Sequence, residues 1–207
     1  CAAICAKALG NDRVFGLFTP EVECKDETNE LGRVIADHLE LQAIREDITP
    51  ILKGAGCYKR RNDAIRMTIP QFKDDWGSKV VIPNISEKNA FSISSIIVQD
   101  NKGNQQKERM NLRSYLQVVA ASNFKQRTRK MIEYYHAERL NYAVVGTPNK
   151  LEYDLGFFVK YGDGAADIKP IAHLYKSQVY DLARYYELPE EIINRPPTTD
   201  TYSLPQS

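Results

Sequence analysis

Short apolar segments alternate with amphipathic segments along much of this chain. Residues 13–18 and 41–44 have the composition of interior strands, and Pro20 prevents the first of these from continuing. Residues 27–39, which lie between them, carry apolar side chains at helical spacing. Alternating strands and helices predict an α/β fold, a doubly wound parallel sheet with flanking helices.

The second half of the chain continues this alternation. The pattern predicts a long helix over residues 112–138, an interior strand over 142–145, a short helix after Asn149 and a further helix over 176–186. In open α/β sheets, ligands bind just beyond the carboxyl ends of the strands. The residues that follow position 145 are therefore the first place to look for a site.

Polar and flexible residues follow the strand at 142–145. Gly146 would let the backbone approach a ligand closely, Thr147 offers a hydroxyl, and Glu152 places a carboxylate about one helical turn further on. The sequence Tyr-Gly-Asp-Gly at 161–164 predicts a tight turn that holds Lys160 and Asp163 beside them. The alternative interpretation is an ordinary strand, helix cap and loop.

Composition fits a cytoplasmic enzyme and excludes few classes. The 207 residues are 43% hydrophobic, enough for one domain with a core. The 28 basic and 27 acidic residues give a formal charge of +1, so no general attraction to nucleic acid or to an anionic membrane is expected. No segment approaches the roughly 18 consecutive apolar residues of a membrane span, and no signal peptide pattern is present.

The four cysteines have the pattern of reduced thiols. Cys1, Cys5, Cys24 and Cys57 lack the spacing of a zinc ribbon and are too few for a disulfide scaffold. Residues 1–10 read as the later part of a helix that ends at a glycine C-cap. We therefore expect further residues to precede this segment in the protein.

Several segments together carry a resemblance to a known family. Read with Arg127, Asp167, Lys176 and the run 195–200, residues 142–164 resemble the ammonia-dependent NAD synthetases, within the N-type ATP pyrophosphatase group. The resemblance covers most of residues 119–200, in the family's order and spacing, and residues 1–47 match more loosely. It implies one adenine nucleotide alpha-hydrolase-like domain over residues 1–207, and a homodimer.

The resemblance also implies a reaction. Enzymes of this family activate the carboxylate of deamido-NAD with ATP, release pyrophosphate, and let ammonia displace AMP to give NAD. Such carbon–nitrogen ligases need cations and a divalent metal around the phosphates, because charge stabilisation is a large catalytic contribution. ATP is thus the implied cosubstrate and Mg²⁺ the implied metal. No Cys, His and Glu set of a glutaminase is evident, so ammonia must come from solution or from another domain or subunit.

The resemblance assigns roles on the ATP side. Thr147, Lys176 and Thr198 would bind ATP, and Glu152 would hold Mg²⁺ with an aspartate from a Ser-Gly-Gly-x-Asp-Ser loop. Lys176 and Glu152 would be the catalytic residues. These 207 residues do not contain that loop, and we expect residues outside this sequence to supply it; a degenerate relative is the alternative. Without the resemblance, Lys176 would read as an ordinary solvated lysine.

By the same resemblance, the positions that contact deamido-NAD are Arg127, Lys160 and Asp167. Arg127 lies in the basic segment 125–131, which alone could also be interpreted as an RNA-binding patch. The chain has Leu151 where the family commonly has Ser. This departure leaves open a related amide ligase acting on another carboxylate, and a catalytically inactive nucleotide-binding module is a third possibility.

Residues 54–111 interrupt the alternation and exceed the connection that the family has at this place. The segment 54–62 reads as a basic loop, and residues 91–99 and 105–110, separated by a turn, predict a β-hairpin. This insertion could be a surface decoration, or a lid or dimer element that shapes the acid pocket.

Overall fold

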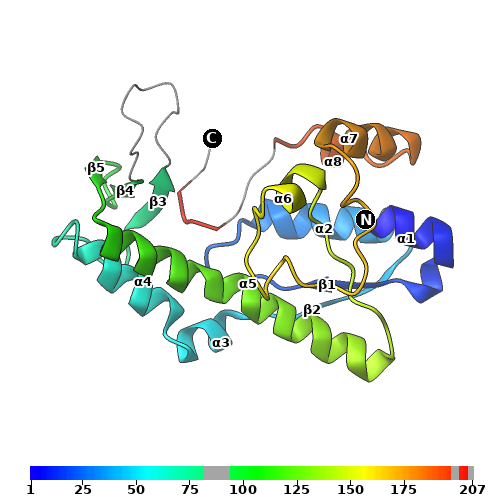
Figure 1. Ribbon diagram of the computed structural model, residues 1–207, viewed down its shortest axis with the longest axis horizontal. Helices are drawn as coiled ribbons and strands as arrows, with labels where there is room; N and C mark the ends of the chain where they lie inside the picture. Colours follow the sequence, from blue (N-terminus) through cyan, green and yellow to red (C-terminus); the bar gives the residue numbers. More distant parts are fainter. Residues whose placement is uncertain (82–93, 197–200, 205–207) are drawn as a thin grey trace. The chain divides into compact units, whose positions relative to one another are not determined.

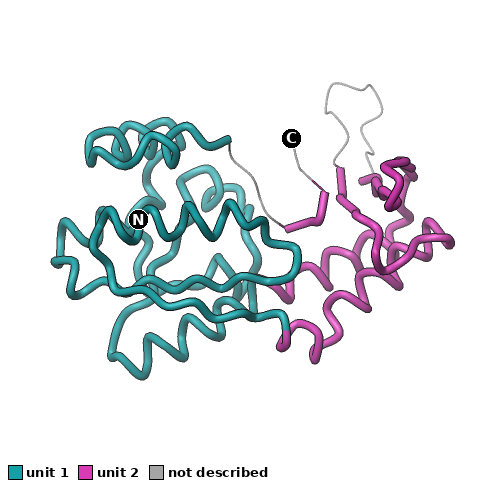
Figure 2. Tube along the Cα trace, turned by 180° about the vertical axis from the view of Figure 1, so that it is seen from behind, with its two compact units in different colours: residues 1–49, 126–196 teal, residues 50–125, 197–207 magenta. Residues whose placement is uncertain are grey.

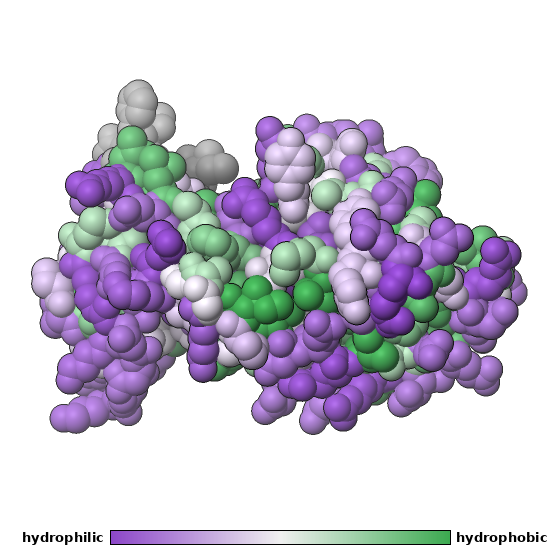
Figure 3. Space-filling view, turned by 90° about the horizontal axis from the view of Figure 1, so that it is seen from below, coloured by the Kyte–Doolittle hydropathy of each residue, from purple (hydrophilic) through white to green (hydrophobic). Residues whose placement is uncertain are grey.

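The computed structural model describes residues 1–81, 94–196 and 201–204 (Figure 1). These residues form two compact units (Figure 2): unit 1 consists of 1–49 and 126–196, and unit 2 consists of the described residues within 50–125 and 197–207. The face seen in Figure 3 carries mostly hydrophilic side chains, with apolar side chains in smaller groups. Within the described ranges, no helix has the length and apolar character required to cross a membrane.

Unit 1 contains the parallel strands expected from the sequence. Strand β1 (Phe15–Phe18) pairs with β2 (Gln42–Arg45), and helix α2 (Asp26–His38) connects them. The register runs from Phe15 opposite Gln42 to Phe18 opposite Arg45. Figure 1 shows these strands between α1 and α2 on one side and the C-terminal half of α5 on the other. A parallel sheet with flanking helices is therefore confirmed, with element ends within two residues of those expected.

The first helix ends as the glycine pattern predicts. Helix α1 (Ala2–Leu9) is followed by Gly10 at φ 96°, a conformation that favours glycine, and then by the short 3₁₀ helix η1 (Asn11–Arg13). The chain then enters β1. Cys5 and two alanines of α1 are buried, so this helix packs on unit 1 through small side chains.

Helix α5 (Leu112–Leu140) is 29 residues long and begins in unit 2 and ends in unit 1. Its Arg129 Nε donates to the Thr19 carbonyl (3.4 Å), just after β1, whereas the Arg139 guanidinium lies 5.8 Å from the ring centre of Phe15, at the start of β1. Helix α5 therefore runs antiparallel to β1. The residues that follow α5 therefore begin beside the start of β1.

The predicted strand at 142–145 is only partly formed. The described backbone there makes a single parallel bridge, between Val145 and Ile168. The Val144 carbonyl accepts from the amides of Asp167 (3.0 Å) and Ile168 (3.2 Å). The prediction of a full strand is wrong, because these few hydrogen bonds on one edge do not make a ladder long enough to define a regular strand.

Three short helices complete unit 1. Helix α6 (Lys150–Asp154) starts after Asn149, as the sequence predicts, and α7 (Lys176–Tyr185) ends one residue before its expected end. Helix α8 (Glu190–Ile193) follows α7, and its Ile193 is buried. Helices α7 and α8 pack against each other, so unit 1 ends in a pair of helices.

Unit 2 contains an antiparallel sheet. Strands β3 (Gly77–Val81), β4 (Ser95–Gln99) and β5 (Gln105–Arg109) are ordered β3-β4-β5. The predicted hairpin is confirmed as β4 and β5. Its turn is stabilised by the Asp100 carboxylate, which accepts from the amides of Lys102 (2.8 Å) and Asn104 (2.9 Å). Residues 91–93 of the expected first strand lie outside the described residues.

The expected loop at 54–62 is wrong. Helix α3 (Thr49–Gly54) and helix α4 (Cys57–Arg66) occupy this stretch. The polar residues of α4 concealed its buried face: Asn62 is buried and donates to the Asp74 carboxylate (2.9 Å). Unit 2 has a closed apolar core formed by α4, the sheet and the start of α5, with members Ala64, Ile65, Ile69, Phe72, Ile96, Val98, Met110 and Val118.

Candidate functional site

The candidate site lies where the 142–145 segment ends. The Gly146 amide donates to the Ile168 carbonyl (2.8 Å), and Thr147 follows with its side chain exposed. A Cβ at position 146 would lie 2.8 Å from the Ala166 Cβ and 3.2 Å from the Lys169 Cγ. In the structure, the space beside Gly146 is therefore occupied by Ala166 and Lys169 of unit 1. From the sequence, we expected that space to admit a ligand.

The polar start of α6 is a capping box. Asn149 Oδ1 accepts from the amides of Leu151 (3.0 Å) and Glu152 (3.2 Å), and Glu152 Oε2 accepts from the Asn149 amide (2.8 Å). This arrangement satisfies amides that a helix start leaves without partners. One oxygen of the predicted metal ligand Glu152 is thus used by the helix cap. A carboxylate has a second oxygen and further lone pairs, so a cation could still be bound.

A metal site is not complete within the described residues. Among the residues at 1–81, 94–196 and 201–204, no group of three or more His, Cys, Asp and Glu side chains is placed to hold a metal ion. Mg²⁺ is commonly bound by one or two carboxylates together with substrate phosphates and water. A single carboxylate such as Glu152 fits that chemistry.

Helix α7 brings Lys176 to the same part of unit 1. The Lys150 amide donates to the Leu174 carbonyl (2.9 Å), which fixes the start of α6 against the turn before α7. Lys176 is the first residue of α7, and its side chain is exposed. Its ammonium group lies 6.0 Å from the ring centre of Tyr180, and it makes no ion pair with any described residue. This lysine therefore has capacity for an anionic ligand.

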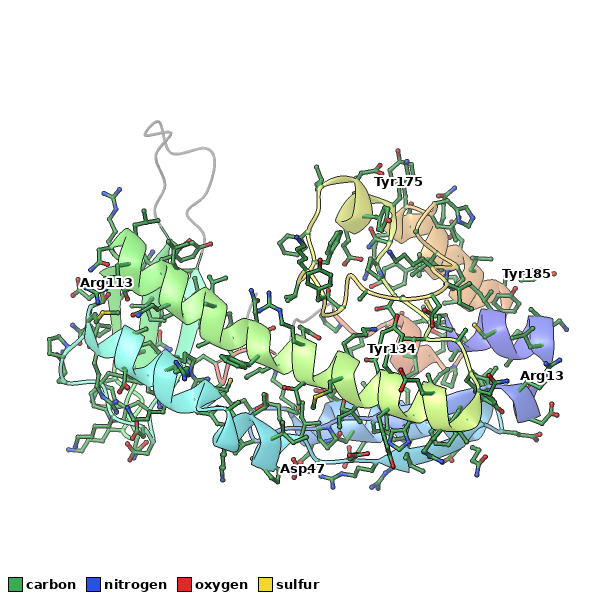
Figure 4. All side chains as sticks on the ribbon, turned by 60° about the horizontal axis from the view of Figure 1, so that its bottom comes forward. Arg13, Asp47, Arg113, Tyr134, Tyr175 and Tyr185 are labelled. Atoms are coloured by element: carbon green, nitrogen blue, oxygen red, sulfur yellow. The ribbon has the colours of Figure 1, made fainter. Side chains whose placement is uncertain are left out.

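Lys150, by contrast, is already paired. Its ammonium group lies 3.0 Å from the Asp154 carboxylate and 5.9 Å from the ring centre of Tyr175, which is labelled beside α7 in Figure 4. The hydrogen bond and the negative charge of Asp154 raise the pKa of Lys150. Of these two lysines, Lys176 is the better candidate for a phosphate contact.

The predicted turn after position 159 is confirmed. Asp163 Oδ1 accepts from the Val159 amide (2.9 Å), and Tyr161 has a φ of 60°. From α5, Arg127 Nε donates to the Lys160 carbonyl (3.1 Å). The structure thus joins the Arg127 side chain to the backbone of Lys160, the other cation that the resemblance assigned to deamido-NAD. Both side chains are exposed, and neither makes an ion pair within the described part of the chain.

Asp167 has two protein partners that the sequence did not predict. Its Oδ2 accepts from the Val144 amide (2.8 Å), and its Oδ1 accepts from the Tyr134 hydroxyl (3.2 Å). Figure 4 labels Tyr134 on α5. Burial and the neighbouring Asp167 carboxylate raise the pKa of Tyr134. Asp167 therefore supports the 142–145 segment, and its predicted substrate contact stays a prediction.

A cavity of about 520 Å³ lies inside unit 1. Its walls come from β1, the C-terminal half of α5, the end of α1 and residues 141–147, and Thr147 and Asp163 are part of them. The remaining predicted ATP contact, Thr198, lies outside the described residues.

Comparison with known proteins indicates what this arrangement is similar to. A sequence model of the NAD synthase family matches residues 58–206. An NH(3)-dependent NAD(+) synthetase of Rhizobium meliloti is 57% identical over 205 residues, which is 99% of this chain and 61% of that protein. One of Mesorhizobium japonicum is 52% identical over 206 residues, 100% of this chain and 65% of that protein. The chain thus spans less than two thirds of the length of these relatives.

Solved structures agree with the sequence comparison. An NH3-dependent NAD synthetase from Campylobacter jejuni, in complex with the nitrate ion, has a TM-score of 0.59 and 26% identity, and the match covers 93% of this chain and 60% of that chain. An NMN synthetase from Francisella tularensis has a TM-score of 0.62 at 22% identity, covering 97% and 63% of the two chains, which supports the fold alone.

Proposed function

Because the chain belongs to the NAD synthase family, we propose that its protein is an ATP-dependent amide ligase that converts deamido-NAD and ammonia into NAD. The deamido-NAD carboxylate attacks the α-phosphorus of ATP and releases pyrophosphate. Ammonia then attacks the acyl carbon of the acyl adenylate, loses a proton, and displaces AMP. The match of the family sequence model to residues 58–206 carries this proposal.

Thr147, Lys176 and Thr198 are the proposed ATP-binding residues. The exposed Lys176 ammonium group, without an ion pair among the described residues, supports an interaction with phosphate oxygens. Thr147 follows the 142–145 segment, in the place where open α/β sheets bind ligands. Such residues raise the rate mainly by stabilising the negative charge that develops on the leaving pyrophosphate.

Mg²⁺ is the proposed metal, and Glu152 is its proposed ligand in this chain. The bound ion would neutralise phosphate charge during adenylyl transfer. The capping box supports a fixed position for the carboxylate, because the Asn149 amide holds one of its oxygens at 2.8 Å. Glu152 and Lys176 are the proposed catalytic residues.

Arg127, Lys160 and Asp167 are the proposed contacts to deamido-NAD. The hydrogen bond between Arg127 Nε and the Lys160 carbonyl holds the Arg127 side chain against the residue that carries the second cation, and a dinucleotide has negative phosphates that suit cationic partners. Replacing Arg127 with alanine should raise KM for deamido-NAD far more than KM for ATP. Equal changes in both KM values would assign Arg127 a structural role instead.

Assembly and location are part of the same proposal. A homodimer in the cytoplasm, acting on small molecules and without a nucleic-acid or membrane partner, fits the family resemblance. The formal charge of +1 supports the lack of a nucleic-acid partner.

Product analysis tests the reaction class. Full-length protein incubated with ATP, Mg²⁺, deamido-NAD and ammonium should form AMP, pyrophosphate and NAD in equal amounts. A Lys176→Met variant, which keeps most of the side-chain length without the charge, is the matched control and should lose most of this turnover. Formation of ADP and phosphate would overturn the mechanism.

A related amide ligase acting on another carboxylate is the second candidate. Leu151, where the family commonly has Ser, is 49% exposed at the start of α6 and so changes the surface beside Glu152. A screen of carboxylic acids for pyrophosphate release would identify this activity. Release with another acid but not with deamido-NAD would favour it, and no release with any acid would favour an inactive nucleotide-binding module.

A further inference from the structure

One edge of the antiparallel sheet in unit 2 is bonded to residues far along the chain. Strand β3 is an outer strand, because the order is β3-β4-β5. The Ser78 amide donates to Ser203 Oγ (2.9 Å), and the Ser78 carbonyl accepts from the Leu204 amide (3.3 Å) and from the Ser203 hydroxyl (3.4 Å). An outer strand leaves such backbone groups unpaired unless another segment covers them. Residues 203 and 204 therefore cover this edge.

Gly77 of β3 provides the space that Leu204 fills. A Cβ at position 77 would lie 2.6 Å from the Leu204 Cδ2 and 3.0 Å from its Cγ. Glycine inside a strand weakens the strand, and it often marks a site where another part of the chain approaches closely. Any other residue at position 77 would force Leu204 to move. Gly77 thus gives up strand stability for a close contact with Leu204.

A buried lysine holds the other end of the same segment. Lys125 of α5 is 1% exposed, and its ammonium group donates to the Thr201 carbonyl (2.8 Å) and lies 5.9 Å from the ring centre of Tyr58. Burial of an ammonium group is unfavourable unless the group is hydrogen-bonded, and bonds from a charged donor are stronger than neutral ones. Tyr202 packs against the apolar core of unit 2. Each of the residues 201–204 therefore has a contact within unit 2.

The anchored segment closely follows a residue of the proposed ATP site. Thr198 precedes Thr201 by three positions, and residues 197–200 lie outside the described residues. Fixing part of a segment in advance lowers the conformational entropy that the segment loses when a ligand binds. Strand β3 belongs to the insertion at 54–111, for which the sequence left open a surface decoration or an element that shapes the acid pocket. The contacts of 201–204 favour a third role, on the ATP side.

We infer that β3 and Lys125 anchor residues 201–204, and that this anchor strengthens ATP binding. The inference rests on the proposed function, because it takes Thr198 as an ATP contact. Gly77, Ser78 and Lys125 are then positioning residues, which act through the chain and not by contact with ATP. The inserted sheet thereby contributes to ATP affinity, and the affinity for deamido-NAD does not depend on it.

Binding measurements on full-length protein test the positioning role. Gly77→Val fills the space of Leu204 with a residue that strands favour, so the sheet should persist. A ligand binds more weakly in proportion to the fraction of protein that is competent to bind, so a segment anchored about a tenth of the time would raise Kd for ATP about tenfold. Calorimetry with Mg²⁺ measures Kd for ATP and, separately, for deamido-NAD. Equal weakening of both ligands would overturn the inference.

Matched variants separate this contact from a general change in the sheet. Gln105→Val is the control, because Gln105 is exposed on the other outer strand and pairs with Gln99, which pairs with Gly77. It should leave Kd for ATP unchanged. Leu204→Ala should weaken ATP binding as Gly77→Val does, and Leu204→Met, which conserves volume, should recover most of the loss. The Gly77→Val and Leu204→Ala changes together should have no larger effect than either alone, because both break one contact. Additive effects would overturn the inference.

Hydrogen exchange of the Leu204 amide tests the anchor without ligand or turnover. This amide should exchange slowly in wild-type full-length protein and faster in Gly77→Val, while the amides of β4 stay slow in both. Unchanged exchange of Leu204 in the variant would overturn the anchor. Slow exchange in wild-type protein that binds no ATP would overturn the proposed function together with the positioning role. Equal ATP affinity of wild-type protein and all variants would overturn the positioning role alone.

Discussion

The two units differ in how completely their strands are buried. In unit 2, Ile96 and Val98 of β4 are 0% and 1% exposed, and the strand alternates between buried and half-buried residues. In unit 1, all four residues of β1 are only half-buried, although the strand lies between helices. In unit 2, strand β4 contributes Ile96 and Val98 to an apolar core, whereas strand β1 of unit 1 borders a cavity.

Helix α5 shows the same difference within one element. In unit 2 its Val118 is 0% exposed and belongs to the apolar core, whereas in unit 1 its Ile132 and Ala137 are 8% and 9% exposed. Charged side chains are buried in both halves: Lys125 in unit 2 is 1% exposed, and Lys130 in unit 1 is 6% exposed and lies 2.5 Å from the Glu133 carboxylate. The two halves of α5 therefore differ in how tightly their apolar side chains are buried and not in whether they bury charge.

A buried histidine illustrates the polar contacts of unit 1. His136 Nε2 lies 2.7 Å from the Glu46 carboxylate, and its Nδ1 accepts from Arg139 Nε (2.8 Å). These two contacts connect α5 to Glu46, the residue that follows β2.

The largest expected effect is in the core of unit 2. Ile96→Ala should lower the free energy of unfolding of unit 2 by about 2–5 kcal/mol, because it removes a fully buried side chain and leaves a cavity. Leu17→Ala in β1 should cost less than half as much, since that site is only half-buried and borders an existing cavity. Hydrogen exchange reports each unit separately. Equal losses would show that the two cores are equally tight.

The next effect concerns the charge at the start of α6. Glu152→Gln should lower turnover of full-length protein by about 10²–10³-fold through weaker Mg²⁺ binding, since it removes charge but little volume. A glutamine oxygen can still accept from the Asn149 amide, so the capping box and the fold should persist. Turnover is measured against Mg²⁺ concentration.

Glu152→Ala is the matched variant, because it removes both the charge and the cap. It should show the same loss of turnover together with lower stability of α6. Near-normal activity of Glu152→Gln at low Mg²⁺ would remove this residue from the metal site.

The sequence predicted those helices and strands whose local residue preferences agree with their packing in the fold. The helical spacing of 27–39 and the turn between β4 and β5 gave α2 and the hairpin with ends close to those observed. Helix α4 was missed because Gly54 and Gly56 suggest a loop, and because buried polar residues such as Asn62 interrupt its apolar spacing. Their partners lie elsewhere in the chain and leave no local signal.

The candidate site was predictable in its residue types but not in its contacts. The family resemblance selected Arg127 and Lys160, and their hydrogen bond joins positions 33 residues apart. No local pattern indicates that Asp167 bonds to the Val144 amide, 23 residues earlier, or that Glu152 uses one oxygen for a helix cap. Long-range contacts of single side chains depend on the whole fold, which periodicity does not describe.

A smaller effect is expected at the helix cap itself. Asn149→Ala should destabilise α6 by about 1 kcal/mol, because the amides of Leu151 and Glu152 lose their acceptor. The amides of these two residues should exchange faster, while those of β4 should not change. Asn149→Ser, which retains an acceptor, should recover most of the loss. Unchanged exchange in the alanine variant would show that water replaces the cap at no cost.

The smallest effect concerns Tyr134 and sharpens the view that unit 1 depends on polar contacts. Burial and the Asp167 carboxylate raise the pKa of Tyr134, so the folded chain favours the neutral hydroxyl that donates to Asp167. This contribution to stability is therefore complete below the ordinary tyrosine pKa of about 10, and is lost as pH rises through the higher folded value.

Tyr134→Phe removes the hydroxyl and should lower stability by less than about 1 kcal/mol at neutral pH, because one neutral hydrogen bond is modest. Urea unfolding of both proteins between pH 7 and an upper limit of about 11 should show the difference shrinking at the alkaline end. If the difference in stability between the two proteins stays constant across this pH range, the Tyr134 hydroxyl does not stabilise the 142–145 segment.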